Sequence, residues 1–179
     1  MKQIYLDNGA TSFTKAPGVG QAMKDYIEKV GVNVNRSSYR ATAEAALSTL
    51  TVREDLCRLF GAGEDPSYAI FTSGVTMSLN MIMKGALHPC DHLIISGMEH
   101  NAVARPATQL EAAGVAVSIA PCDEDGVLRL EGFEKLITPK TRLAVMQYAS
   151  NVSGTIQPME EIGAICRRHG VLLAVDSAQ

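Results

Sequence analysis

Side chains that can do chemistry follow several of the short apolar runs in this chain. His100 comes after "HLIISG", Asn151 directly follows "RLAVMQYAS", and Asp176 lies at the end of "VLLAVD". An imidazole can stack on a flat heteroaromatic ring or move a proton near neutral pH. A buried carboxylate requires a cation or several hydrogen-bond donors. Asp176 therefore predicts a partner, and the three residues together predict a ligand site.

A fourth apolar run, "YAIF", is followed by "TSGVTMSLN". Thr72 or Ser73 can cap a helix that begins near Val75. The free N–H groups of Gly74, Val75 and Thr76 would then face an anion, and the Thr76 hydroxyl would add a donor. The alternative is an ordinary capped helix start. A Walker loop is excluded because no Gly-Lys-Ser/Thr follows.

The other candidates also have purely structural interpretations. A histidine in a loop, such as His100, is often exposed and has no role. The Asn151 amide can hold the tight turn that Gly154 permits, and Asp176 can cap a following helix. Gln179, three positions beyond Asp176, is a further polar candidate.

Alternating apolar runs and amphipathic stretches must position these residues. This alternation, joined by short turns, predicts an α/β fold with three layers, in which a mainly parallel sheet is covered by helices on both faces. Ligands of such sheets bind beyond the carboxyl ends of the strands. The expected strands are 68–73, 92–97, 115–120, 142–150 and 171–177, and the expected helices between them are 76–86, 102–113, 130–137 and 159–169.

Two further helices are expected upstream, over 16–31 and 37–63, the second closed by Gly61 and Gly63. No repeat, low-complexity tract or linker interrupts the chain. We therefore expect one globular unit.

Composition restricts the function classes. The chain has 179 residues, 46% of them hydrophobic, and a formal net charge of −3. It offers no basic field for nucleic acid or an anionic membrane, which favours a small-molecule partner. Without a long apolar segment or a signal peptide, the cytoplasm is the expected compartment. The four cysteines form no CxxC pair and predict neither a metal site nor a disulfide framework.

Five motifs, in their order along the chain, carry a resemblance to a known family. "YLDNGATS", "FTSGVTMSLN", "MEHNAVARP", "SNVSGTIQP" and "VDSAQ" together resemble the pyridoxal-phosphate enzymes of the class V aminotransferase family. Within that family, the chain is most similar to the cysteine desulfurase and selenocysteine lyase branch. The resemblance extends over essentially the whole chain and implies the large domain of a fold-type-I pyridoxal-phosphate transferase.

The resemblance also implies roles for individual residues. Asp176 would pair with the pyridine nitrogen of pyridoxal 5'-phosphate, and His100, as the catalytic candidate, would stack on the ring. Asn151 and Gln179 would donate hydrogen bonds around the phenolic oxygen of the ring. The phosphate would rest on Gly74, Val75 and Thr76, and the segment with Asn8, Ala10 and Thr11 would fold back toward the substrate.

The same resemblance implies that residues 1–179 hold the N-terminal segment and most of the cofactor-binding large domain. The small C-terminal domain and the lysine that forms the Schiff base would then lie outside the chain. None of its lysines has the expected "HK" setting: Lys2, Lys15, Lys24, Lys29, Lys84, Lys135 and Lys140. We therefore expect this chain alone to be inactive, and the full-length protein to be a homodimer.

The expected activity is removal of sulfur or selenium from a cysteine-type amino acid. Two departures from the pattern of the resembling family weaken the substrate assignment. Val75 stands in the phosphate turn where many relatives have Gly or Ala, and "SNVSG" stands where desulfurases often have Asn-Asn-Glu-Ile-Gly. Alternatives are an aminotransferase, a kynureninase-like hydrolase, or a noncatalytic segment that binds cofactor or a partner. A nucleotide-binding α/β domain is disfavoured by the absence of GxGxxG and of a Walker lysine.

Overall fold

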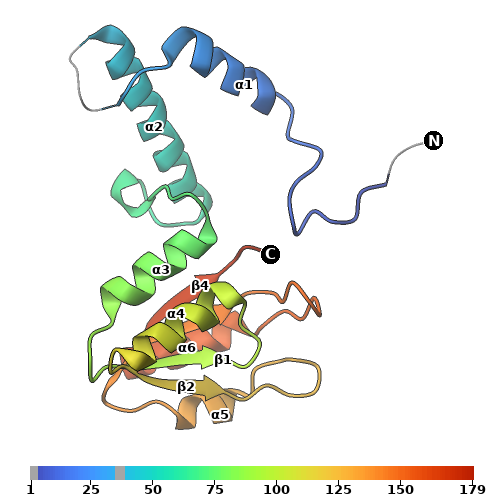
Figure 1. Ribbon diagram of the computed structural model, residues 1–179, viewed down its shortest axis with the longest axis vertical. Helices are drawn as coiled ribbons and strands as arrows, with labels where there is room; N and C mark the ends of the chain where they lie inside the picture. Colours follow the sequence, from blue (N-terminus) through green and yellow to red (C-terminus); the bar gives the residue numbers. More distant parts are fainter. Residues whose placement is uncertain (1–3, 35–38) are drawn as a thin grey trace. The chain divides into compact units, whose positions relative to one another are not determined.

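The computed structural model describes residues 4–34 and 39–179. They form two compact units, Met1–Phe71 and Thr72–Gln179 (Figure 1). The expectation of one globular unit is therefore wrong. Both hydrophobic clusters of the described residues lie between Leu79 and Ala174, so the sequence before Thr72 contributes to neither of them.

The first unit is helical. It contains α1 (Val19–Asp25), a π-helical turn η1 (Tyr26–Val30), α2 (Arg40–Leu59) and a 3₁₀ turn η2 (Pro66–Tyr68). The helix expected over 16–31 is thus divided between α1 and η1. The second expected helix is confirmed as α2, although positions 37 and 38 lie outside the described residues. α1 and η1 bury no residue, and α2 buries only Thr42, Ala45 and Cys57.

The strand expected over 68–73 does not form. Pro66–Tyr68 is a 3₁₀ turn, capped by the Asp65 side chain, which accepts from the Ser67 N–H. Ile70 and Phe71 then remain 67% and 53% exposed. A strand requires a neighbour that pairs with its backbone, and no described strand pairs with this segment. Apolar character was therefore insufficient to predict a strand.

The second unit alternates helices and strands. α3 (Val75–Ala86) leads to β1 (His92–Ser96), α4 (Asn101–Ala112), β2 (Ala116–Ala120), α5 (Leu130–Lys135), β3 (Thr141–Gln147), α6 (Met159–His169) and β4 (Leu172–Asp176). All strand pairs are parallel, in the order β2-β1-β3-β4. These four strands and four helices confirm the elements that the sequence predicts after Gly74.

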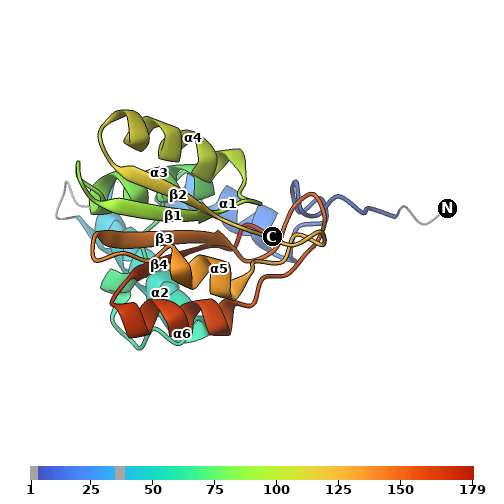
Figure 2. The same ribbon diagram turned by 90° about the horizontal axis from the view of Figure 1, so that it is seen from below.

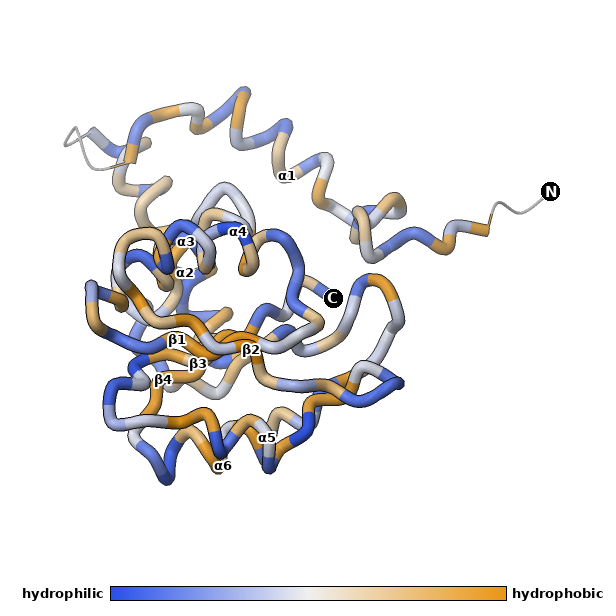
Figure 3. Tube along the Cα trace, turned by 60° about the horizontal axis from the view of Figure 1, so that its bottom comes forward, coloured by the Kyte–Doolittle hydropathy of each residue, from blue (hydrophilic) through white to orange (hydrophobic). Residues whose placement is uncertain are grey.

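The helices cover both faces of this sheet, which confirms the three-layer α/β/α architecture. Figure 2 shows α3 and α4 on one face and α5 and α6 on the other. In Figure 3 the strands are the most hydrophobic part of this unit. This pattern is expected of a parallel sheet buried on both faces.

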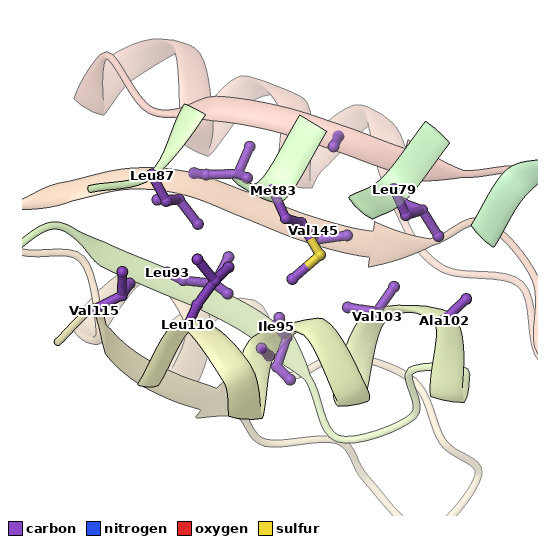
Figure 4. Packing of buried hydrophobic residues seen from close by; sticks show 13 residues of the cluster. Leu79, Met83, Leu87, Leu93, Ile95, Ala102, Val103, Leu110, Val115 and Val145 are labelled. Carbon is purple, nitrogen blue, oxygen red and sulfur yellow. The ribbon is translucent and has the colours of Figure 1, made fainter. Parts of the chain in front are cut away.

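Alternating strand residues divide the core between the two faces. Leu93, Ile95, Val145 and Ala174 pack against α3 and α4 (Figure 4). The neighbouring residues Ile94, Ala144 and Met146 pack against α5 and α6, where Phe133 is completely buried. Because side chains alternate along a strand, Gln147 and Asp176 follow the first pattern and belong to the face of α3 and α4.

Candidate active site

Three parallel strands end together at one edge of the sheet. Ser96, Gln147 and Asp176 are the last residues of β1, β3 and β4, which are neighbours in the sheet. α4 connects the parallel strands β1 and β2, so it runs antiparallel to them and begins at this edge. α3 also begins here, because in Figure 4 its residue Leu79 lies toward the arrowhead end of the strands and Leu87, just after its last turn, toward the opposite end. The candidate site therefore consists of strand ends and helix N-termini within one unit.

The beginning of α3 forms an anion-binding geometry. The N–H groups of Val75 and Thr76 have no acceptor in the described part of the chain, as is usual in the first turn of a helix. Gly74 adopts φ 151° and ψ 170°, a conformation accessible almost only to glycine. Val75 and Thr76 are exposed and can therefore reach a ligand.

Neither predicted cap of this helix is confirmed. Gly74 occupies the N-cap position of α3, where no side chain bonds to the first turn. The Thr72 hydroxyl accepts from the Gly74 N–H at 3.3 Å and lies 2.7 Å from the Ser78 hydroxyl. Thr72 therefore holds the turn before the helix rather than the helix itself.

His100 is the N-cap of α4. Its Nδ1 accepts from the Ala102 N–H at 3.1 Å, so in the neutral ring the proton is on Nε2. The side chain is exposed at the edge of the sheet. The capping bond fixes the ring through one nitrogen and leaves the other nitrogen and the ring face available.

Asp176 is 7% exposed, which confirms that its carboxylate is buried. Its Oδ1 accepts from the Ala178 N–H at 3.1 Å. None of the ion pairs found between described residues involves Asp176. One local hydrogen bond does not neutralise a buried carboxylate, so this position fits a cationic group.

Glu99 and Gln147 also lie at this edge, although neither was predicted from the sequence. Glu99 Oε1 accepts from the Ser96 hydroxyl at 2.5 Å and from the Gln147 backbone N–H at 3.0 Å. Glu99 Oε2 and Gln147 Nε2 are buried and have no hydrogen-bond partner in the described chain. Glu99 stands beside His100 in "MEHNAVARP", and its carboxyl group so close to a strand end was an available signal.

Burial raises the pKa of Glu99 to about 7. The hydrogen bonds from Ser96 and Gln147 oppose this rise, and the negative charge of Asp176 adds to it. Glu99 and Asp176 therefore interact electrostatically, and a strongly raised carboxyl pKa in a polar cluster is typical of a functional site.

Asn151 lies in the turn after β3, where its side chain is exposed and forms no hydrogen bond with another described residue. The Ser150 hydroxyl holds this turn instead, by accepting from the N–H groups of Val152 and Ser153. Gly154 has φ 76°, in agreement with the expected tight turn. Gln179 follows β4 and is also exposed.

Asn8, Ala10 and Thr11 belong to the first unit and lie in and just after a turn. The N–H groups of Ala10 and Thr11 donate to the Asp7 carbonyl, and the Tyr5 hydroxyl donates to the Thr11 carbonyl. All three candidates are exposed. Their approach to a substrate remains a prediction.

Two other classes of site are absent from the described residues. They contain no group of three His, Cys, Asp or Glu side chains arranged to hold a metal ion. None of their helices has the length and apolar character needed to cross a membrane.

The donor set fits pyridoxal phosphate. The first turn of α3 offers N–H groups to a phosphate, buried Asp176 can receive a protonated ring nitrogen, and His100 presents a flat ring. The unpartnered Gln147 amide is a further buried donor that sequence analysis did not predict. These groups belong to one unit and one edge of its sheet.

Comparison with known proteins agrees with this arrangement. A family model described as Aminotransferase class-V matches residues 4–179. A probable cysteine desulfurase of Halalkalibacterium halodurans is 34% identical over 181 aligned residues, which cover 98% of this chain and 44% of the relative.

Solved structures show the same fold. The apo structure of a cysteine desulfurase from Thermococcus onnurineus NA1 has a TM-score of 0.88 at 30% identity, and the matched region covers 98% of this chain and 44% of the desulfurase chain. SspA in complex with cysteine has a TM-score of 0.81 at 29% identity, and the matched region covers 96% of this chain and 50% of the SspA chain. The chain thus spans half or less of the length of these proteins. Because the family model matches nearly all of its residues, the chain belongs to the class V aminotransferase family.

Proposed function

We propose that this chain provides the cofactor-binding edge of a pyridoxal-phosphate enzyme that removes sulfur from a cysteine-type amino acid. The observation that carries the proposal is buried Asp176, which has no cation among the described residues and lies at the sheet edge where α3 and α4 begin. Similarity to cysteine desulfurases supports the substrate class, as does the cysteine complex of SspA. Selenocysteine is a second substrate of the same chemical type.

Each candidate residue has a distinct binding role in this proposal. Asp176 accepts a charge-assisted hydrogen bond from the protonated ring nitrogen. Val75 and Thr76 bind the phosphate through backbone N–H groups, while Gly74, whose own N–H donates to the Thr72 hydroxyl, lets the backbone approach the phosphate closely. His100 stacks on the ring while its Nδ1 remains bonded to Ala102. Asn151 and Gln179, exposed near the same edge, reach the phenolic oxygen.

Bound pyridoxal phosphate would supply an electron sink for the negative charge that develops at the substrate α-carbon. The chain contributes by orientation and electrostatics. Asp176 keeps the ring nitrogen protonated, and His100, with its proton on Nε2, can hold or move a proton at that atom.

The remaining parts of the proposal concern the full-length protein. The covalent lysine would come from sequence beyond these residues, so the chain alone would not turn over. Asn8, Ala10 and Thr11 would contact the substrate. We further propose a homodimer in the cytoplasm.

Binding of pyridoxamine 5'-phosphate to the chain tests the proposed site, because its amine cannot condense with surface lysines. A charge-assisted hydrogen bond contributes about 1.5–3 kcal/mol, so Asp176→Asn should weaken binding about tenfold or more. Asp125→Asn, the same change at an exposed loop carboxylate, should leave the affinity unchanged. Calorimetric titration measures both.

Pyridoxamine without the phosphate is the matched ligand control. It should bind more weakly than the phosphorylated compound, since it cannot use the N–H groups at the start of α3. Equal affinity of the two ligands, or equal affinity of the wild-type chain and Asp176→Asn, would contradict the proposed site.

A further inference from the structure

Glu99 links β1 to β3 at the candidate site. It follows β1, accepts through Oε1 from the Ser96 hydroxyl, and also accepts from the Gln147 N–H at the end of β3. Gln147 is the register partner of Asp176 on β4. The Glu99 carboxyl group is therefore held beside the residue that we assign to the ring nitrogen.

The surroundings of Glu99 favour its neutral form. Ser96 and Gln147 are each 3% exposed, and Glu99 Oε2 is buried without a partner in the described residues. No ion pair within residues 4–34 and 39–179 involves Glu99. An ionised Oε2 would be a buried charge with neither a donor nor a cation, whereas a protonated Oε2 avoids this penalty.

Asp176 differs from Glu99 in one respect. Its Oδ1 accepts the Ala178 N–H, and neither of its carboxyl oxygens is among the buried atoms of the described residues that lack a hydrogen-bond partner. When two buried carboxyl groups interact, the proton is favoured on an oxygen that is buried without a donor, because nothing there would stabilise a negative charge; between these two groups that oxygen is Glu99 Oε2. By this criterion the proton belongs on Glu99 Oε2.

Other titratable groups near Glu99 do not offset its charge. Cys122, beyond the end of β2, has its thiol pKa raised by burial, with smaller increases from Asp123 and Glu99. It is therefore a neutral neighbour. His100 is adjacent in sequence, but its Nδ1 is occupied by the Ala102 N–H.

We propose that Glu99 is a positioning residue that holds a proton beside Asp176, so that the two carboxyl groups present one negative charge, on Asp176, to the ring nitrogen. The assignment of that nitrogen rests on the function proposed above. Glu99 thus acts on the ligand through Asp176 and does not touch it.

Carbon-13 NMR of the glutamate carboxyl groups in the ligand-free chain tests this role. One glutamate should titrate near pH 7, and its signal should be lost in Glu99→Gln. The exposed Glu111→Gln on α4 should leave that titration in place. In Asp176→Asn the midpoint of Glu99 should move to lower pH, a shift that a merely structural glutamate would not show.

Ser96→Ala supplies a second test should Asp176→Asn fold poorly. Removing a hydroxyl that stabilises the ionised form should raise the midpoint of Glu99. A titration midpoint of Glu99 near the ordinary 4.5 in the wild type would overturn the inference. An unchanged midpoint of Glu99 in folded Asp176→Asn would overturn it as well.

This titration is separable from the function proposed above because no ligand is added. If pyridoxamine phosphate fails to bind while Glu99 titrates as expected, the cofactor assignment is overturned and the proton on Glu99 is supported. If the ligand binds and Glu99 titrates in the ordinary range, the positioning role is overturned and the cofactor assignment stands.

Discussion

At the scale of single residues, the sheet contains a buried histidine at the opposite end from the candidate site. His92 begins β1 and is 5% exposed. Its Nδ1 lies 2.7 Å from the Thr141 hydroxyl on β3, and its Nε2 lies 2.9 Å from the Ser118 hydroxyl on β2. His92 therefore links three strands through its two ring nitrogens. Burial lowers its pKa from the ordinary value of 6.5.

The lowered pKa of His92 predicts how the free energy of unfolding changes with pH. Below pH 6.5 the unfolded chain binds a proton at His92 that the folded chain binds less readily, so the free energy of unfolding should fall as pH falls. Glu99 has the opposite effect, since its raised pKa makes stability decrease as pH rises from 4.5 to about 7. Urea unfolding at steps of about one pH unit between pH 5 and 8 gives the free energy of unfolding of the wild type, His92→Gln and Glu99→Gln. The difference between the wild type and each variant at each pH then gives the contribution of that residue.

His92→Gln should therefore remove the loss of stability on the acid side. It should also cost roughly 1–3 kcal/mol at neutral pH, because one or both hydroxyl partners lose their hydrogen bond. His88→Gln, at an exposed turn position, is the control and should change neither property. An unaltered acid-side slope in His92→Gln would assign that slope to another group.

At the scale of elements, buried Gln157 joins two segments that flank the candidate site. It is 4% exposed, accepts from the Leu128 N–H at 2.9 Å and donates to the Gly126 carbonyl at 2.8 Å. Its own N–H donates to the Tyr148 carbonyl, just beyond β3. The segment after β2 is thus fixed to the loop that carries Asn151.

Gln157→Leu keeps a similar volume and removes both side-chain hydrogen bonds. Each of the two buried backbone groups left without a partner costs about 1–3 kcal/mol, so we expect a destabilisation of roughly 2–6 kcal/mol. Gln109→Leu, at an exposed position of α4, should cost much less. Chemical denaturation measures both, and equal losses in the two variants would show that the bonds of Gln157 contribute little.

At the scale of the whole molecule, the sheet in the second unit has two open edges. β2 and β4 each pair on one side only among the described strands. Ile119 on β2 is 64% exposed, and Leu172 and Val175 on β4 are 52% and 41% exposed. Unpaired strand edges with exposed apolar side chains favour association between chains.

We therefore expect the chain to associate as its concentration rises. The double variant Ile119→Lys and Val175→Lys places a charge on each edge strand and should lower the average mass at the same concentration. Val152→Lys is the control, because Val152 is 87% exposed but lies in a loop. Light scattering over a concentration series measures the mass, and a wild-type chain that stays monomeric throughout would contradict the expectation.

Much of the second unit is determined by local sequence. The period of the apolar residues is a property of neighbouring positions, so the runs that become β1, β2, β3 and β4, and the helices between them, could be predicted. The same periodicity puts Asp176 at a strand end and His100 at a helix start. The sequence by itself therefore determined the layers and the edge at which a site would lie.

Only the tertiary structure decided which groups meet at that edge. Glu99 accepts from Gln147, 48 positions away, because β1 and β3 are neighbours in the sheet, a pairing that no local pattern reports. Likewise, the run at 68–73 reads as a strand but lacks a described partner. Strand pairing and burial depend on distant parts of the chain, and these determine whether a carboxyl group is protonated and whether an apolar run becomes a strand.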